Sequence, residues 1–279
     1  MIIDFHTHVF PERIAARAIK KLAQNGDVHP FSDGTAAGLL RAERAAGVDR
    51  SILLPVATKP EQVHSINDHA AQLNRHAFVT NQFSFGAMHP DYENWRQELD
   101  RMAANGLRGL KIHPVYQNAA LDDIRFLRIL ERAGELGLIV VTHAGLDIGF
   151  PGDLHAVPEC ARRALLAVGP VQLVLAHMGG WRCWERVADQ LADTSALLDT
   201  SFSLGVQTPL DPAHEPQPLL SADAFTALVH TFGAERILFG TDSPWSDPMD
   251  ALRRIRALPL SDEEKAAILG GNAQRLLKL

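Results

Sequence analysis

Eight short apolar runs recur along the 279-residue chain, and this repetition is the feature that most constrains its fold. Most of the runs are continuous and rich in branched residues, which is typical of parallel strands that are covered on both faces. The runs are Ile2–His6, Arg50–Val56, Gln82–Met88, Leu107–His113, Leu138–His143, Val171–His177, Ala196–Phe202 and Arg236–Asp242. The pattern predicts a set of parallel strands joined by crossover connections.

Segments with a helical period separate these runs. The clearest is Asp122–Leu136, in which Ile124, Leu127, Leu130 and Ala133 recur between charged residues. Others are Glu61–His76, Asp91–Asn105, Glu159–Val168, Trp181–Ala192 and Ala222–Phe232. Alternating strands and helices are typical of βαβ units, so the chain predicts an α/β fold, namely a (β/α)8 TIM barrel. A doubly wound open sheet is the alternative, although no GxGxxG motif follows a strand.

Two connections are longer than the rest. Residues 9–34, after the first strand, contain an inserted helix at about Glu12–Gln24, and a Pro-rich loop, Gly205–Ser221, follows the seventh strand. Both leave the carboxyl ends of strands, where barrel enzymes keep their active sites, so each is either a lid or a plain excursion. Barrels of roughly 250 residues are commonly single units, and we predict one domain, residues 1–279.

The bulk composition excludes several classes of protein. The net charge of −6 and the pI of about 6.1 disfavour nucleic-acid binding. No apolar stretch is long enough to span a membrane, and the N-terminus lacks a signal-peptide pattern. Cys160 and Cys183 fit no metal motif and are expected to be reduced packing residues. We therefore expect a cytoplasmic protein with a small-molecule substrate; a homodimer is compatible with the sequence.

The first run ends in His6-Thr7-His8. Side chains two apart along a strand point to the same face, so the two imidazoles can bind one metal ion. The alternative is a pair of ordinary polar residues leaving a strand. Three later runs end in His143, His177 and Asp242, and a barrel points these strand ends at one mouth. Imidazole and carboxylate are normal zinc ligands, which favours a shared metal site.

Two of these residues have a simpler interpretation. His143 could be a buried histidine bonded to a backbone carbonyl. Asp242 could be a helix cap or turn carboxylate, since Ser243-Pro244 begins a turn.

Taken together, these motifs resemble the amidohydrolase superfamily, in particular the amidohydrolase-related branch that includes aminocarboxymuconate-semialdehyde decarboxylase and many metal-dependent hydrolases. The resemblance rests on His6-Thr7-His8, His143, His177 and Gly240–Trp245, and the terminal Gly271–Leu277 is similar to the closing motif of that branch. It covers the whole chain in order and spacing. It is specific for the fold and the metal site but not for the substrate, because the same framework serves hydrolysis, decarboxylation and hydration.

The resemblance implies that His6, His8 and His143 bind one divalent metal ion, preferentially Zn²⁺ with Mn²⁺ or Fe²⁺ as alternatives. It makes Asp242 a fourth, weaker ligand and places His177 beside the metal-bound water. A bound cation lowers the pKa of its water to about 7. Asp242 would accept the proton of that water, and His177 would orient the water or stabilise developing negative charge.

Lys111 leaves three interpretations open. It could hold a substrate carboxylate or pair with a neighbour of the metal site, bridge two metal ions as a carbamylated lysine, or form a structural salt bridge. The second interpretation follows binuclear members of the superfamily. His113 shares the face of Lys111 and is a second candidate for substrate binding. Trp245 is a candidate wall of the substrate pocket or a packing residue.

These inferences predict a metal-dependent hydrolase that acts on a small amide, lactone or ester through a metal-activated water. The alternative is a non-oxidative decarboxylase of an unsaturated or aromatic carboxylic acid, favoured by basic residues near the metal. A non-catalytic metal-stabilised binding protein is a third class, which His177 and Asp242 argue against.

Overall fold

The computed structural model describes all residues, Met1–Leu279. The chain forms two compact units, and each is described by itself: unit 1 contains Met1–Leu53 and Asp199–Leu279, and unit 2 contains Leu54–Leu198. The expectation of one domain stays a prediction. No helix combines the length and the apolar composition that a membrane span requires.

Unit 1 joins the two ends of the chain. Its strands are β1 (Ile3–Thr7), β2 (Arg50–Leu53), β9 (Val206–Gln207), β10 (Gln217–Pro218) and β11 (Ile237–Leu238). Its helices are α1 (Glu12–Gly26), α2 (Ala36–Ala46), α9 (Ala222–Phe232), α10 (Pro248–Ala257), α11 (Asp262–Ala266) and α12 (Asn272–Leu277), with a 3-10 turn at Ala234–Arg236 and a π turn at Ala267–Gly271. β1 and β2 run parallel, with Ile3 opposite Arg50. The inserted helix after the first strand is present as α1.

The end of the chain ties β11 in place. The Asn272 side chain donates to the carbonyls of Ala234 and Ile237 at 2.7 and 2.6 Å. The backbone N–H of Phe5 donates to Phe239 at 2.7 Å, so β1 lies directly beside the segment that follows β11. The closing motif noted in the sequence therefore holds the strand that leads to Asp242.

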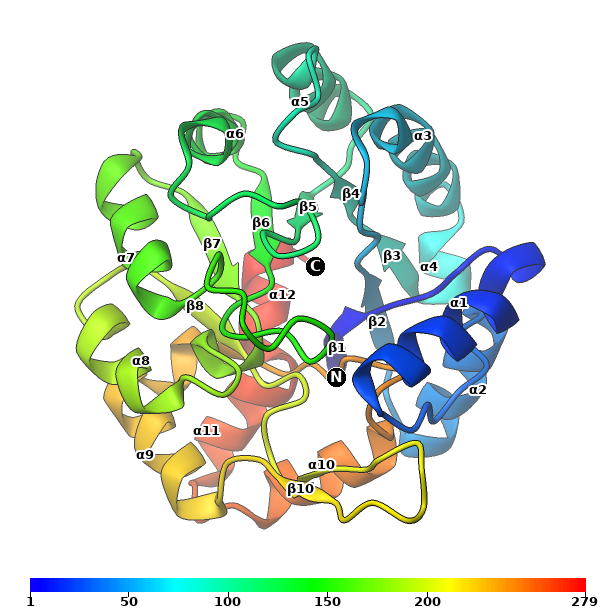
Figure 1. Ribbon diagram of the computed structural model, residues 1–279, viewed down its shortest axis with the longest axis vertical. Helices are drawn as coiled ribbons and strands as arrows, with labels where there is room; N and C mark the ends of the chain where they lie inside the picture. Colours follow the sequence, from blue (N-terminus) through cyan, green and yellow to red (C-terminus); the bar gives the residue numbers. More distant parts are fainter. The chain divides into compact units, whose positions relative to one another are not determined.

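Unit 2 carries the regular alternation of strands and helices (Figure 1). Its strands are β3 (Gln82–Ser84), β4 (Gly86–Ala87), β5 (Gly109–Ile112), β6 (Ile139–Thr142), β7 (Gln172–Leu175) and β8 (Leu197–Asp199, whose last residue belongs to unit 1). Its helices are α3 (Val63–Asn74), α4 (Ala77–Thr80), α5 (Trp95–Ala104), α6 (Ile124–Glu135), α7 (Pro158–Ala167) and α8 (Trp184–Leu191), with 3-10 turns at Pro60–Gln62 and His177–Gly179. Strands β4 to β8 pair in sequence order, all parallel. This is the arrangement that the continuous apolar runs predicted.

In helix α6 the apolar face predicted from the sequence can be compared with the face that is buried. Asp123 caps the helix by accepting the backbone N–H of Arg125 at 2.8 Å. The buried stripe is Phe126, Ile129, Leu130 and Ala133. Ile124, which we expected in this stripe, is 71 % exposed, because the first turn of the helix presents it away from the strands. The stripe is thus displaced from the predicted one, while the helix itself is confirmed.

The two long connections of unit 1, residues 9–34 and Gly205–Ser221, are hydrogen-bonded to each other. The Asp27 carboxylate accepts the backbone N–H groups of Leu210 and Asp211, both at 3.1 Å, and lies 2.7 Å from Nδ1 of His214. The backbone N–H of His29 donates to Thr208 at 2.8 Å. We call these contacts the loop clasp. The Pro-rich loop is therefore folded onto the first connection, and it forms the short antiparallel pair β9–β10.

Candidate metal centre

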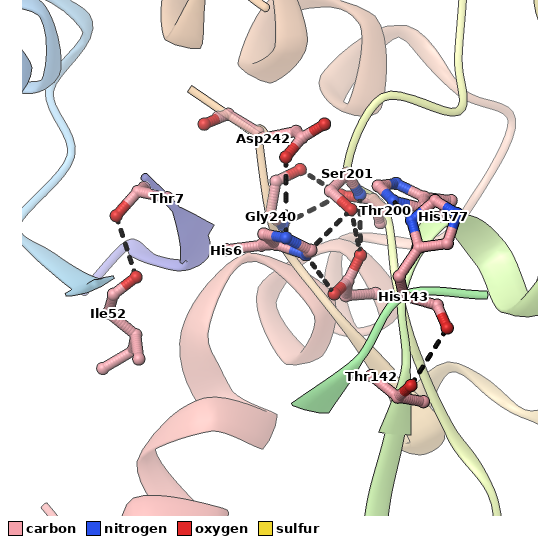
Figure 2. Close-up of polar contacts among 12 residues, drawn as sticks. His6, Thr7, Ile52, Thr142, His143, His177, Thr200, Ser201, Gly240 and Asp242 are labelled. Atoms are coloured by element: carbon pink, nitrogen blue, oxygen red, sulfur yellow. Dashed lines mark hydrogen bonds and ion pairs between the residues drawn. The ribbon is translucent and has the colours of Figure 1, made fainter. Parts of the chain in front are cut away.

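Three ligand-type side chains of unit 1 converge where β1 ends. Nε2 of His6 lies 3.5 Å from Oδ1 of Asp242 (Figure 2). Nε2 of His8 lies 3.2 Å from each of these two atoms. His6 and Asp242 are buried, and His8 is half-buried. Three donor atoms held this closely are suited to a divalent cation, because imidazole and carboxylate ligands surround zinc at about 2.0–2.2 Å. We call these three residues the first ligand group.

A second carboxylate prepares His6 for this role. Nδ1 of His6 lies 3.1 Å from Oγ of Ser201 (Figure 2). The same nitrogen lies 2.8 Å from Oδ2 of Asp199. The Ser201 backbone N–H donates to Asp199 at 3.0 Å, and its hydroxyl also donates to this carboxylate. Because Asp199 accepts the proton on Nδ1, the lone pair of His6 is left on Nε2, where the metal would bind. A carboxylate behind a ligating histidine is the usual support of such a site.

Sequence reasoning missed Asp199. It follows Leu197-Leu198 within one of the predicted strands, so a carboxylate at that strand end was the available signal. The position of a carboxylate at a strand end does not determine its role. It can bind the metal, bind a ligand of the metal or face a neighbouring helix.

The backbone around Asp242 is held by Asp4, which lies two residues before His6. Asp4 accepts the hydroxyl of Thr241 at 2.5 Å and the backbone N–H groups of Thr241 and His6 at 3.0 and 3.2 Å. Asp242 takes a left-handed conformation with φ of 63°. Its backbone N–H donates to the carbonyl of His6 at 2.8 Å. Burial raises the pKa of Asp4 to about 7 in spite of its hydrogen bonds. A buried acid thus fixes the ligating strand end to the turn that carries Asp242.

Unit 2 holds its own pair of imidazoles. Nδ1 of His143 lies 3.1 Å from Nε2 of His177, and Nε2 of His143 lies 3.0 Å from the carbonyl of Leu146. His177 has φ of 58°, a left-handed conformation at the end of β7, and its carbonyl accepts the indole N–H of Trp184 at 2.9 Å. The carbonyl contact of His143 is the one that the simpler interpretation expected. It also places the proton of His143 on Nε2, so that Nδ1 keeps the lone pair.

His113 and Asp147 complete a second cluster of ligand types in unit 2. His113 stacks on His143 with ring centres 4.3 Å apart, and Nε2 of His113 lies 3.7 Å from Oδ2 of Asp147. Oδ2 of Asp147 is 4.0 Å from Nε2 of His143. Nδ1 of His113 accepts the backbone N–H of Tyr116 at 3.4 Å, so its Nε2 carries the proton. A protonated nitrogen offers no lone pair, so in this protonation state Nε2 of His113 and Nε2 of His143 are donors, and Asp147 offers the acceptor oxygen of the cluster.

The other two candidates for substrate binding lie in different units. Lys111 is buried on β5, where it pairs in register with Val141 of β6. Trp245 lines a cavity of unit 1. The structure thus brings together His6, His8 and Asp242 in unit 1, and His143 and His177 in unit 2. The roles of Lys111, His113 and Trp245 in substrate binding stay predictions.

Solved structures similar to the chain over its whole length have the TIM-barrel fold that the sequence predicted. An uncharacterised TIM-barrel protein from Bordetella bronchiseptica is 17 % identical, with a TM-score of 0.74 over 99 % of this chain and 98 % of that one. The 5-carboxyvanillate decarboxylase LigW from Sphingomonas paucimobilis is 18 % identical, with a TM-score of 0.68 over 100 % and 99 %. The Metarhizium anisopliae IDCase is 16 % identical, with a TM-score of 0.72 over 100 % and 97 %.

The family is shown by sequence as well. The model of the amidohydrolase family matches residues 3–279, so the chain belongs to this family, as the resemblance predicted. No curated protein sequence matches the chain.

Proposed function

We propose that this protein is a metal-dependent lyase that removes carbon dioxide from an unsaturated or aromatic carboxylic acid without oxidation. The observation that carries the proposal is the first ligand group, with its nitrogen and oxygen atoms 3.2–3.5 Å apart and Asp199 behind His6. Structures similar over the whole chain support decarboxylation over hydrolysis, because several of them are decarboxylases of aromatic acids.

The donor set suits a single divalent cation. Two imidazole nitrogens and one carboxylate oxygen are compatible with both Zn²⁺ and Mn²⁺. A dihydroxybenzoic acid decarboxylase from Polaromonas, similar in fold to this chain, was solved with manganese. We therefore propose one divalent ion held by His6, His8 and Asp242, and we retain His143 as the further ligand that the resemblance implies.

When bound, such an ion supplies Lewis-acid polarisation of a substrate oxygen and stabilises negative charge that develops on the substrate. The residues of the chain would do the remaining work. Asp199 holds His6 in its ligating tautomer. Asp242, whose second carboxylate oxygen is not needed for ligation, can carry a proton to or from the reacting carbon.

Hydrolysis of a small amide, lactone or ester is the second candidate. The position of Asp242 beside the two histidines favours it, because a carboxylate there can also take the proton of an activated water.

The two candidates differ in their products. Purified protein loaded with Mn²⁺ or Zn²⁺ is incubated with a panel of hydroxybenzoates and unsaturated dicarboxylates, and with a panel of lactones, esters and amides. Release of carbon dioxide from an acid, lost in His8→Ala and kept in the surface control His69→Ala, is the expected result. Hydrolysis by the metal-loaded protein with no decarboxylation of any acid would overturn the proposal in favour of the second candidate.

A further inference from the structure

Unit 1 contains a cavity of about 380 Å³ that the first ligand group does not enter. Its walls include three aromatic rings, Phe31, Phe202 and Trp245, and none of His6, His8 and Asp242 lines it. Thr200 and Thr241, each next in sequence to a residue of the metal centre (Asp199 or Asp242), also line the cavity. A volume of this size is sufficient for a small organic ligand.

Gly240, in the wall of the cavity, packs directly against His6 of the first ligand group. A methyl group on Gly240, which also lines the cavity, would lie 2.8 Å from Cβ of His6. The hydroxyl of Thr200 donates to the carbonyl of Gly240 at 2.9 Å. The cavity is therefore adjacent to the first ligand group but distinct from it.

Arg254, on α10, is the one cation in the wall of this cavity. Its Nε donates to Oδ2 of Asp250 at 2.6 Å, and this is its one hydrogen bond to the protein. The guanidinium packs against the backbone of Gly205, where an added methyl group would lie 2.5 Å from Cζ. Gly205 has φ of 103°, so a glycine here provides both the turn and the space for the arginine. Neither terminal nitrogen of Arg254 makes a hydrogen bond to the protein; Nη1 packs against Gly205, and Nη2 can donate to a carboxylate in the cavity.

The charges around the cavity restrict the ligand. Asp247 and Asp250 also line it. Asp247 caps α10 by accepting the backbone N–H of Met249 at 3.1 Å, and Asp250 accepts from both Arg253 and Arg254. One arginine against two carboxylates leaves the wall with a net charge of −1. This charge disfavours a dianion such as a phosphate monoester, and a monoanion gains only where its carboxylate pairs directly with Arg254.

Two apolar side chains in the wall of the cavity are exposed to solvent. Phe31 is 40 % exposed and Val206 is 46 % exposed, and both line the cavity at the loops joined by the loop clasp. Apolar side chains at the rim of a concave, partly polar surface are typical of a ligand site.

We propose that this cavity is a second ligand site, which binds a small planar monocarboxylate with its ring among Phe31, Phe202 and Trp245 and its carboxylate on Arg254. The site does not depend on the metal or on the proposed activity, and it would serve an aromatic acid as an effector or as a reservoir next to the catalytic strand ends.

Benzoate is the probe, measured by isothermal titration calorimetry against the full-length protein. To remove any contribution of a metal-bound carboxylate, the titration is done both with the metal-loaded wild type and with His8→Ala. We expect one benzoate per chain to bind in both. Arg254→Met, which keeps the aliphatic stem, should weaken binding by about 10- to 100-fold, the scale of hydrogen bonds to a charged group.

Arg253→Met is the matched control, since Arg253 also binds Asp250 but does not line the cavity. It should leave benzoate affinity unchanged. Ala251→Phe fills the cavity without altering charge and should abolish binding, which keeps the test valid if Arg254→Met is poorly folded. Binding that is lost in His8→Ala and unchanged in Arg254→Met, displacement of benzoate by inorganic phosphate, or no binding to either protein at millimolar benzoate would each overturn the proposal.

Discussion

Each unit of this protein has a largely buried group of imidazoles with a carboxylate nearby, but the hydrogen-bond partners of the ring nitrogens differ between the two groups. In unit 1, Asp199 accepts the proton on Nδ1 of His6, and Nε2 points at His8 and Asp242. In unit 2, Nε2 of His143 donates to the backbone carbonyl of Leu146. The first group thus presents the Nε2 lone pair of His6 to His8 and Asp242, while the cluster of unit 2 is joined by stacking and hydrogen bonds.

The different hydrogen-bond partners of these histidines indicate that residue type and proximity do not by themselves define a metal site. Three ligand atoms lie within 4.8 Å of one another in both units. What distinguishes them is the partner of the outer ring nitrogen, because that partner decides which nitrogen keeps its lone pair.

The comparison predicts its largest effect for metal content. His8→Ala removes one of the three ligands of unit 1 and should leave the purified protein nearly free of metal and inactive. His113→Ala, its counterpart in unit 2, should retain the metal of the wild type. Both contents are measured by elemental mass spectrometry on protein prepared with the same metal supplement. If His113→Ala loses as much metal as His8→Ala, the prediction that the two groups differ in metal binding is wrong.

A second test separates the two histidines of unit 2. The resemblance implies that His143 is a ligand and that His177 acts beside the metal. His177→Ala should therefore retain most of the metal while the catalysed rate falls by about 10²–10⁴-fold, the scale of one acid–base or electrostatic group. His143→Ala should lose metal and activity together. If His177→Ala loses its metal as completely, His177 is itself a ligand, and a binuclear arrangement that involves Lys111 becomes the better description.

A smaller effect is expected from the carboxylate behind His6. In Asp199→Asn the amide no longer accepts the Nδ1 proton as a carboxylate does, so the ligating tautomer of His6 loses its support. Metal affinity should fall by about 10- to 100-fold, measured by competition with a chromophoric chelator. Ser201→Ala, which removes the weaker contact to His6, should have less effect. Equal metal affinity in Asp199→Asn and the wild type would mean that the contact with Asp199 does not prepare His6 to bind the metal.

The smallest effect concerns the buried acids under the first ligand group. Glu43 accepts the hydroxyl of Ser51 at 2.8 Å, and burial together with the nearby charge of Asp4 raises the pKa of Glu43 to about 9. The folded protein thus holds a proton that the unfolded chain releases near pH 4.5. The free energy of unfolding should fall as the pH rises between these values, by at most about 1.4 kcal/mol per pH unit.

Glu43→Gln should flatten this dependence, measured by urea denaturation between pH 6 and about 8. The exposed control Glu131→Gln should keep the slope of the wild type. An unchanged slope in Glu43→Gln would mean that the carboxyl of Glu43 is ionised in the folded protein.

The fold was predictable because its signal is repeated. Continuous apolar runs with amphipathic segments between them indicate parallel strands whichever single run is misjudged. The boundaries were less predictable: the third run is divided into β3 and β4, and the last contains only the short β11. These departures arise where backbone hydrogen bonding, rather than side-chain pattern, decides the end of a strand.

The candidate site was predictable where local geometry suffices. Residues two apart on a strand share a face, so His6 and His8 meet without knowledge of the rest of the chain. Asp199 and the cavity beside Arg254 could not be found in this way. Each depends on which distant segments pack together, and a carboxylate or an arginine has the same local pattern whether it serves a site or the surface.

The loop clasp bears on how fast a ligand enters and leaves the cavity, rather than on how tightly it binds. Asp27 and His214 are 43 % and 61 % exposed, and an ion pair this accessible to water contributes little free energy. The rest of the clasp is three backbone hydrogen bonds at the surface. Motions of surface loops take nanoseconds to microseconds, which is faster than common enzyme turnover of about 1–10³ s⁻¹. A ligand under Phe31 and Val206 would therefore exchange many times in each catalytic cycle. The occupancy of the cavity would therefore be at equilibrium with the free concentration of the acid during each catalytic cycle.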